Sequence, residues 1–168
     1  MRALSSGLFS DPTLTKRTTP ARSRYPMANK PQKRVLYVEA SDLVQASHPP
    51  ALEQLNCLVV QVSSAPAALE ALASQDPFNL ILVGDVSRPT ENPEAELSVI
   101  RRARQQDAEV PILVFTSHNY LQQAYQAGAT AHMEKPAGVM ALIEFVTPYL
   151  FHVSEVRPRK QDFDDTVQ

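Results

Sequence analysis

The chain has 168 residues, of which 43% are hydrophobic, and this length and composition predict one domain with a substantial core. Cys57 is the only cysteine, which excludes an internal disulfide and a zinc site built from cysteines. No window approaches the roughly 18 apolar residues of a membrane span, and the first residues lack the apolar segment of a secretory signal. We therefore expect a cytoplasmic protein with no membrane partner.

The formal net charge of −2 is unevenly distributed along the chain. Residues 1–34 carry a charge of +7, residues 35–152 carry −8, and the remaining residues carry −1. Nucleic-acid binding needs clustered cations that contact phosphates. We therefore expect no nucleic-acid partner for the acidic body, although a nucleic-acid-binding arm stays open as one use of the basic segment.

Three segments are expected along the chain. Residues 1–32 are rich in Ser, Thr, Pro and Arg without periodicity, which predicts a disordered basic leader. An organellar transit peptide, or a true translation start at Met27, are the alternatives for this segment. Residues 33–152 show the regular pattern of a folded domain, and residues 153–168 form a polar tail that we expect to be disordered.

The folded pattern begins with an apolar run at residues 35–38, the first predicted strand, which ends at Glu39. A short helix is expected over residues 50–56, because Pro49 and Pro50 would break the interior of a longer one. Residues 57–62 form the second predicted strand. The next helix is expected to be capped by Ser63 or Ser64 and to end before Asp76-Pro77.

Residues 80–83, Leu-Ile-Leu-Val, are typical of a strand buried on both faces, and this run ends at Gly84 and Asp85. The remaining predicted elements follow in order: a helix over 94–106, a strand over 111–116, a short helix over 120–126 closed by Gly128, a strand over 129–134, and a helix over 139–150 that Pro148 is expected to kink.

Five buried strands that alternate with helices predict an α/β fold with a parallel sheet and right-handed crossovers. We expect a doubly wound three-layer sandwich whose five-stranded sheet has the order 2-1-3-4-5, the flavodoxin-like arrangement. Ligands of such sheets bind at the carboxyl ends of the strands, where the strand order reverses.

Polar side chains follow four of these strands. The predicted strand order brings Glu39 and Asp85 together at the carboxyl edge of the sheet. Two neighbouring carboxylates suit either a divalent cation such as Mg²⁺ or acid–base chemistry in which the two groups have different pKa values. Thr116 adds a hydroxyl at the end of the fourth strand, and Lys135 adds an ammonium after the fifth. Together the four groups predict a site for an anion of phosphoryl size.

The region from about residue 33 to residue 151 resembles the receiver domains of two-component response regulators. The segment 36–39 resembles the first strand with its leading acid, and 59–72 resembles the second strand with its helix. Further matches are Asp85-Val86-Ser87-Arg88-Pro89 to the phosphoacceptor and its following proline, Thr116-Ser117 to the hydroxyl pair, Ala127-Gly128-Ala129 to a turn, and Lys135-Pro136 to the closing pair.

The resemblance implies that Asp85 accepts a phosphoryl group from a sensor histidine kinase or a phosphotransfer protein, and that Thr116 and Lys135 bind this group. It also implies that Mg²⁺ is held by Glu39, Asp85 and the backbone carbonyl of Ser87. A downstream protein would contact the face formed by the fourth helix, the fifth strand and the fifth helix. The chain would not be a turnover enzyme, because Asp85 would be its own substrate.

The sequence departs from the receiver pattern at Ala40, where receivers carry a second acid that binds the metal. The affinity for Mg²⁺ is therefore expected to be weak or lost. A pseudo-receiver, an interaction module that works without phosphorylation, is the alternative function, and a small hydrolase using Glu39 and Asp85 is a third hypothesis. A structural ion pair between Glu39 and Lys135 also stays open.

Histidines need separate interpretation. His118 lies two residues after Thr116, where the family tunes dephosphorylation, and an exposed loop histidine is the simpler interpretation. His132 stands where the family usually has an aromatic switch residue. His48 and His152 have no companions at metal-ligand spacing, so we expect both at the surface.

Overall fold

The computed structural model describes residues 32–74, 76–88 and 91–151, so the predictions about the leader, the tail, Pro89 and His152 lie outside it. The described elements, in chain order, are β1 (Lys33–Val38), α1 (Asp42–Gln45), α2 (His48–Gln54), β2 (Cys57–Val62), α3 (Ala65–Ala73), β3 (Leu80–Val83), α4 (Glu94–Gln106), β4 (Ile112–Thr116), α5 (Leu121–Ala127), β5 (Ala131–Glu134) and α6 (Val139–Phe151).

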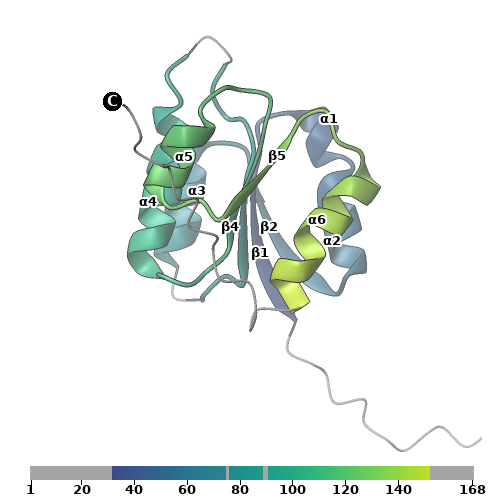
Figure 1. The fold of residues 1–168 in the computed structure, drawn as a ribbon. Coiled ribbons are helices and arrows are strands. Elements are labelled where there is room, and N and C mark those ends of the chain that lie inside the picture. Colours follow the sequence, from purple (N-terminus) through teal and green to yellow (C-terminus); the bar gives the residue numbers. More distant parts are fainter. Residues whose placement is uncertain (1–31, 75, 89–90, 152–168) are drawn as a thin grey trace, which may run out of the picture. The chain divides into compact units, whose positions relative to one another are not determined.

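The five strands form one parallel sheet with the order β2-β1-β3-β4-β5, which confirms the predicted topology (Figure 1). Val38, at the end of β1, pairs with Val62 of β2 and with Val83 of β3. Thr116, at the end of β4, pairs with Glu134 of β5. The strands therefore end side by side, and the residues that follow them emerge at one edge of the sheet.

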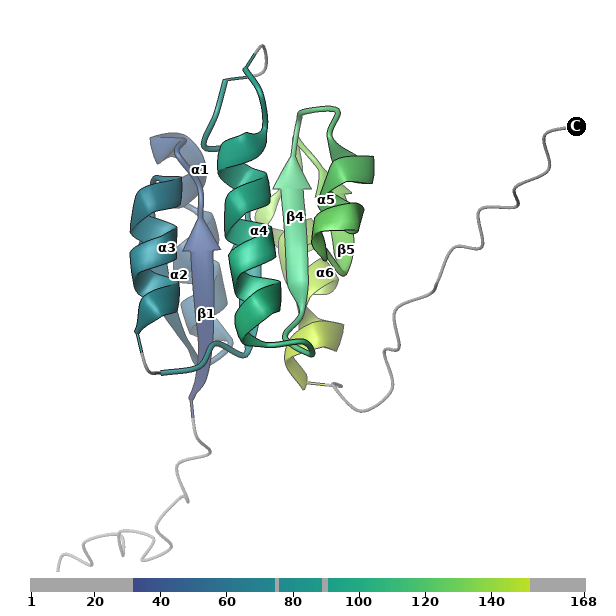
Figure 2. The same cartoon turned by 90° about the vertical axis from the view of Figure 1, so that its left-hand side faces the viewer.

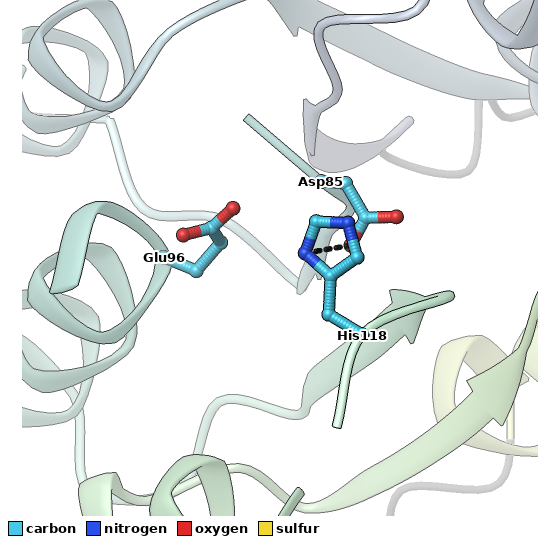
Figure 3. A group of neighbouring side chains, drawn as sticks. All are labelled: Asp85, Glu96 and His118. Carbon is cyan, nitrogen blue, oxygen red and sulfur yellow. Dashed lines mark ion pairs between the residues drawn. The ribbon is translucent and has the colours of Figure 1, made fainter. Parts of the chain in front are cut away.

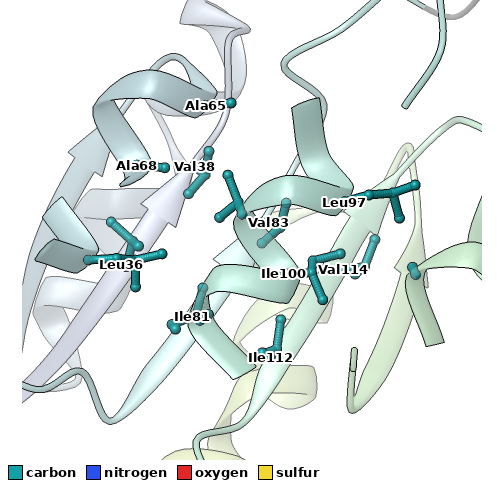
Figure 4. Close-up of a cluster of buried hydrophobic side chains, with 14 of the residues drawn as sticks. Leu36, Val38, Ala65, Ala68, Ile81, Val83, Leu97, Ile100, Ile112 and Val114 are labelled. Atoms are coloured by element: carbon teal, nitrogen blue, oxygen red, sulfur yellow. The ribbon is translucent and has the colours of Figure 1, made fainter. Parts of the chain in front are cut away.

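Helices cover both faces of the sheet and make three layers. Helices α3, α4 and α5 lie on one face and α1, α2 and α6 on the other (Figures 1 and 2). Successive strand residues point to opposite faces, so each strand supplies both layers. On the α3–α4–α5 face, alternate strand residues such as Leu36, Ile81 and Val114 pack against Ala68 of α3 and Ile100 of α4 (Figure 4).

The opposite face contains a buried histidine. Leu52 of α2 and Leu142 of α6 pack there against Tyr37 and Phe115. His48 is only 3% exposed, its Nδ1 lies 3.0 Å from the Tyr37 hydroxyl, and its ring lies 5.1 Å from the Phe115 ring. The expectation that His48 lies at the surface is wrong, because the first turn of α2 turns this side chain toward the sheet.

The segment between β1 and β2 differs from the prediction. It contains two helices, α1 and α2, where one helix over residues 50–56 was expected. Pro49 and Pro50 lie in the first turn of α2, where a proline removes no hydrogen bond, since these backbone N–H groups have no partner within the helix. The proline pair therefore begins a helix instead of breaking one.

Other boundaries agree with the sequence. The Ser64 hydroxyl accepts a hydrogen bond from the Ala67 N–H at 3.3 Å and caps α3. Gly128 closes α5 with a φ of 116°, the left-handed conformation that glycine adopts most easily. Helix α6 continues through Pro148 to Phe151. Among the residues that the structure describes, no helix has the length and apolar character needed to cross a membrane.

Candidate functional site

The site lies at the carboxyl edge of the sheet, where the structure brings Glu39, Asp85, Thr116 and Lys135 together. The backbone continues the strand pairing beyond the strands themselves. The Ala40 N–H donates to the Asp85 carbonyl at 3.0 Å, and the Lys135 N–H donates to the Thr116 carbonyl at 3.0 Å. These bonds fix the backbone from which each of the four side chains extends.

Asp85 is the centre of this arrangement, and both of its carboxylate oxygens accept hydrogen bonds. The Thr116 hydroxyl donates to Oδ1, while the N–H and the hydroxyl of Ser117 each donate to Oδ2 at 3.1 Å. Burial raises the pKa of Asp85, but the hydrogen bonds from Thr116 and Ser117 and the nearby Lys135 lower it more, so the net pKa falls below its ordinary value. Asp85 is therefore an ionised carboxylate at neutral pH.

Glu39 and Lys135 form an ion pair that also reaches Asp85. The Lys135 Nζ lies 2.5 Å from Glu39 Oε2 and 3.1 Å from Asp85 Oδ2. Glu39 is 1% exposed, and its Oε1 accepts the Ser41 N–H at 2.9 Å. The ion pair between Glu39 and Lys135, which the sequence analysis left as an alternative, is thus present. The Lys135 ammonium group bridges the carboxylates of Glu39 and Asp85.

The absence of a side chain at Gly84 makes this pairing possible. A Cβ atom at position 84 would overlap the Glu39 carboxylate and lie 2.9 Å from the Val38 carbonyl oxygen. The Gly84 N–H donates to that same carbonyl at 2.6 Å, which keeps the two backbones close. Gly84 therefore leaves the space into which Glu39 folds to meet Lys135.

The donor set is sufficient for a divalent cation with few protein ligands. Glu39 and Asp85 both contact one cationic group, the Lys135 ammonium, so their oxygens converge on a single position. Ala40 adds no oxygen ligand from its side chain. Mg²⁺ in proteins is commonly held by one or two carboxylates and keeps several waters, so these residues fit it, although Lys135 competes for the same oxygens.

Two further residues of the site were not predicted in their observed roles. Glu96 of α4 is completely buried, and its Oε1 accepts the N–H of Val86, the N–H of Ser87 and the Ser87 hydroxyl at 2.9, 2.8 and 2.7 Å. It fixes the loop that follows Asp85. An acid in the first turn of a helix was visible in the sequence, but such acids are common because they complement the helix dipole.

His118 is the second such residue. Its side chain is only 9% exposed, and its Nδ1 lies 3.7 Å from Asp85 Oδ1. The simpler interpretation, an exposed loop histidine, is therefore wrong. The His118 N–H donates to the Thr116 hydroxyl oxygen at 2.9 Å, which turns the chain back over the strand end and places the ring next to Asp85.

Tyr120 lies behind these groups and is 2% exposed. Burial raises the pKa of Tyr120, and the negative charges of Glu96 and Asp85 raise it further. The Tyr120 hydroxyl is therefore neutral at ordinary pH. In front of the site, a hollow of about 240 Å³ is lined by Thr116, Ser117, His118, Asn119, Leu121, Glu134 and Lys135. A small anion can approach the Lys135 side of the site through this hollow.

Comparison with known proteins finds likeness at the level of structure. No protein-family model matches the sequence, and no curated protein matches it. A CheY-like response regulator receiver domain protein from Methanospirillum hungatei aligns with a TM-score of 0.62 at 22% identity, covering 72% of this chain and 95% of that one.

Two other solved structures agree. A response regulator receiver protein from Sinorhizobium medicae aligns with a TM-score of 0.61 at 25% identity, over 71% of this chain and 95% of that one. The chemotaxis response regulator CheY4 of Vibrio cholerae aligns with a TM-score of 0.60 at 22% identity, over 71% and 99%. The described part of this chain therefore has the fold of response regulator receiver domains.

Proposed function

We propose that the chain is a receiver in two-component phosphorelay signalling, with Asp85 as the residue that accepts the phosphoryl group. One observation carries this proposal. The Asp85 carboxylate lies at the carboxyl edge of the sheet, ionised, with the Thr116 hydroxyl and the Lys135 ammonium as direct partners. A nucleophilic oxygen, a neutral donor and a cation at one point meet the needs of phosphoryl transfer, which depends on positioning and charge stabilisation.

The proposed step is an in-line displacement at phosphorus. An oxygen of Asp85 forms a new O–P bond, and the bond from phosphorus to the donor nitrogen of a phosphohistidine breaks, with its electron pair leaving on that nitrogen. Lys135 neutralises charge on the phosphoryl oxygens, and the Thr116 hydroxyl, released from Asp85, donates to one of them. Because Asp85 is itself modified, we propose no turnover of a separate substrate.

Glu39, Asp85 and the backbone carbonyl of Ser87 would hold Mg²⁺ in this proposal. When bound, the ion supplies positive charge that offsets the repulsion between the carboxylates and the incoming phosphoryl group. Lys135 must leave Glu39 for this to happen, since it occupies Glu39 Oε2. With Ala40 contributing no oxygen, we expect the affinity for Mg²⁺ to be low.

The proposed partners are a sensor histidine kinase or phosphotransfer protein upstream and a downstream protein that contacts the α5–β5–α6 face. This face presents a polar aromatic pair, the Tyr125 hydroxyl at 2.7 Å from His132 Nδ1, and Tyr125 is 43% exposed. A phosphoryl group on Asp85 would draw Thr116 and Lys135, which border β5, and so connect the site to this face.

Intact-mass spectrometry tests the proposal. The full chain is incubated with Mg²⁺ and acetyl phosphate, and we expect an added mass of one phosphoryl group. Asp85→Asn should remove the adduct, while Asp42→Asn, which changes an exposed acid on the first helix after β1, should keep it. No adduct on the wild-type chain, or an adduct on Asp85→Asn, would refute Asp85 as the acceptor.

A further inference from the structure

A second group of potential metal ligands includes Asp85 but neither Glu39 nor Lys135. One ligand atom each from Asp85, Glu96 and His118 lies within 4.8 Å of the other two. The three residues come from different segments: the loop after β3, the first turn of α4 and the loop after β4. Figure 3 shows the three side chains together, with the contact between the His118 ring and the Asp85 carboxylate marked.

Two buried polar atoms beside this group lack hydrogen-bond partners. Glu96 Oε1 accepts three hydrogen bonds, but Oε2 of the same completely buried carboxylate accepts none. The hydroxyl of Tyr120 also has no partner, and the Tyr120 ring meets the His118 ring edge-on at 6.4 Å. A buried carboxylate oxygen without a donor loses its hydration and gains no hydrogen bond, and a bound ion is one arrangement that would compensate for this loss.

We propose that Asp85, Glu96 and His118 bind a divalent transition-metal ion, for which Zn²⁺ is the appropriate probe. An imidazole together with two carboxylates suits Zn²⁺ and its neighbours, whereas Mg²⁺ prefers oxygen ligands alone. Three protein ligands leave a fourth coordination position for water. This site shares only Asp85 with the Mg²⁺ site proposed above, and its existence does not depend on phosphoryl transfer.

The geometry requires a modest contraction. Zn²⁺ binds nitrogen and oxygen at about 2.0–2.2 Å, so tetrahedral ligand atoms lie about 3.4 Å apart. His118 Nδ1 and Asp85 Oδ1 are already 3.7 Å apart, and the other separations do not exceed 4.8 Å. A shift of about 1 Å in the His118 ring and the Glu96 carboxylate would close the site. Two negative charges and a neutral imidazole would balance the divalent ion.

Binding at this site would occupy the carboxylate of Asp85. An oxygen coordinated to a transition metal is a weaker nucleophile and is held away from an incoming phosphoryl group. A bound Zn²⁺ would therefore oppose phosphorylation of Asp85, which gives the site an inhibitory role if the proposed function holds.

Calorimetric titration of the full chain, freed of metal by chelation, tests the metal site directly. We expect one equivalent of Zn²⁺ to bind, with affinity reduced roughly tenfold or more in His118→Gln and in Glu96→Gln. Glu96→Gln keeps an amide oxygen for the N–H groups of Val86 and Ser87 and replaces only the second oxygen, so the loop should stay folded. Circular dichroism checks this for each variant.

The matched control is His132→Gln, which removes a histidine of the β5 strand that lies outside the group. It should leave the Zn²⁺ affinity unchanged. Co²⁺ gives a second readout, because a nitrogen-containing four-coordinate site produces visible absorption that His118→Gln should abolish. The proposal is overturned if the wild type binds no Zn²⁺, or if folded His118→Gln and Glu96→Gln bind it as tightly as the wild type does.

Discussion

Replacing Gly84 by alanine tests whether the close approach of β3 to Glu39 sets the geometry of the site. A Cβ atom at this position overlaps the Glu39 carboxylate and lies 2.9 Å from the Val38 carbonyl oxygen. The Val38 contact involves backbone that also accepts the Gly84 N–H at 2.6 Å. Neither neighbour can move away easily. Glu39 is held by its ion pair with Lys135, and Val38 is paired on both sides, with Val62 of β2 and Val83 of β3.

These contacts determine the loss of stability that we expect in Gly84→Ala. Overpacking a well-packed interior lowers the free energy of unfolding by typically about 1–3 kcal/mol, and we expect Gly84→Ala near the upper value since backbone must move. For a domain of this size, about 3 kcal/mol corresponds to a fall in Tm of about 10 °C. Relieving the overlap with Glu39 should recover part of the loss, so Gly84→Ala should destabilise a Glu39→Ala background less than the wild type.

Urea denaturation and thermal melts followed by circular dichroism measure these differences. Gly138→Ala is the matched control, because a Cβ atom there meets nothing within 4 Å and the glycine has no positive φ. Its stability should equal or slightly exceed that of the wild type. If Gly84→Ala and Gly138→Ala have the same stability, the close packing of Glu39 against β3 does not constrain the site.

Three other substitutions give separate tests. Lys135→Met leaves the buried Glu39 carboxylate without its cation and should lower the free energy of unfolding, measured in urea, by roughly 3–5 kcal/mol. Adding Glu39→Gln should restore most of this stability. A loss below about 1 kcal/mol would show that the ion pair contributes little to stability. Ser64→Ala removes the side-chain cap of α3 and should lower the free energy of unfolding by about 1 kcal/mol. The neighbouring Ser63→Ala should leave it unchanged in the same assay. Equal losses of stability in the two variants would contradict Ser64 as the cap. Burial and the nearby positive charge of Lys135 lower the pKa of His48 below its ordinary value of 6.5. As the pH drops below 6.5, the unfolded chain therefore binds a proton before the folded chain does, and the free energy of unfolding should fall. This part of the pH dependence should disappear in His48→Gln, and a pH dependence equal to that of the wild type would refute the lowered pKa of His48.

The sheet and the position of the site were predictable because they depend on local patterns. The run Leu80–Val83 is unbroken and apolar, and all four residues are buried between the two helical layers. The residue after such a strand, or the next one, must lie at the carboxyl edge of the sheet. Together with the predicted strand order, this rule placed Glu39, Asp85 and Lys135 close together, as the structure shows.

The parts that were missed depend on tertiary contacts with weak local signals. Helix α1 has only four residues, which is too short for a helical period to show in the sequence. His48 is a single polar residue at a helix start, and only the fold shows that it meets the Tyr37 hydroxyl. The helical period predicts which residues share a face, but it does not predict which polar residue that face will bury.

Glu96 and His118 show the same limit at the site itself. Glu96 lies in the first turn of an amphipathic helix, where an acid is favourable without any further role. Its burial follows from the loop after Asp85, which folds back and donates three hydrogen bonds to it. His118 reaches Asp85 only because its backbone bonds to the Thr116 hydroxyl. Both contacts join segments whose relative positions could not be predicted from the sequence pattern.

The central claim is that Asp85 forms an acyl phosphate, and reductive trapping tests it most directly. After treatment with acetyl phosphate and Mg²⁺, borohydride reduces an aspartyl phosphate to homoserine with release of phosphate, and peptide mapping locates the change. We predict homoserine at position 85 and at no other acidic residue. Homoserine elsewhere, or an unchanged Asp85 in a chain shown to be folded, would contradict the proposed phosphoryl acceptor.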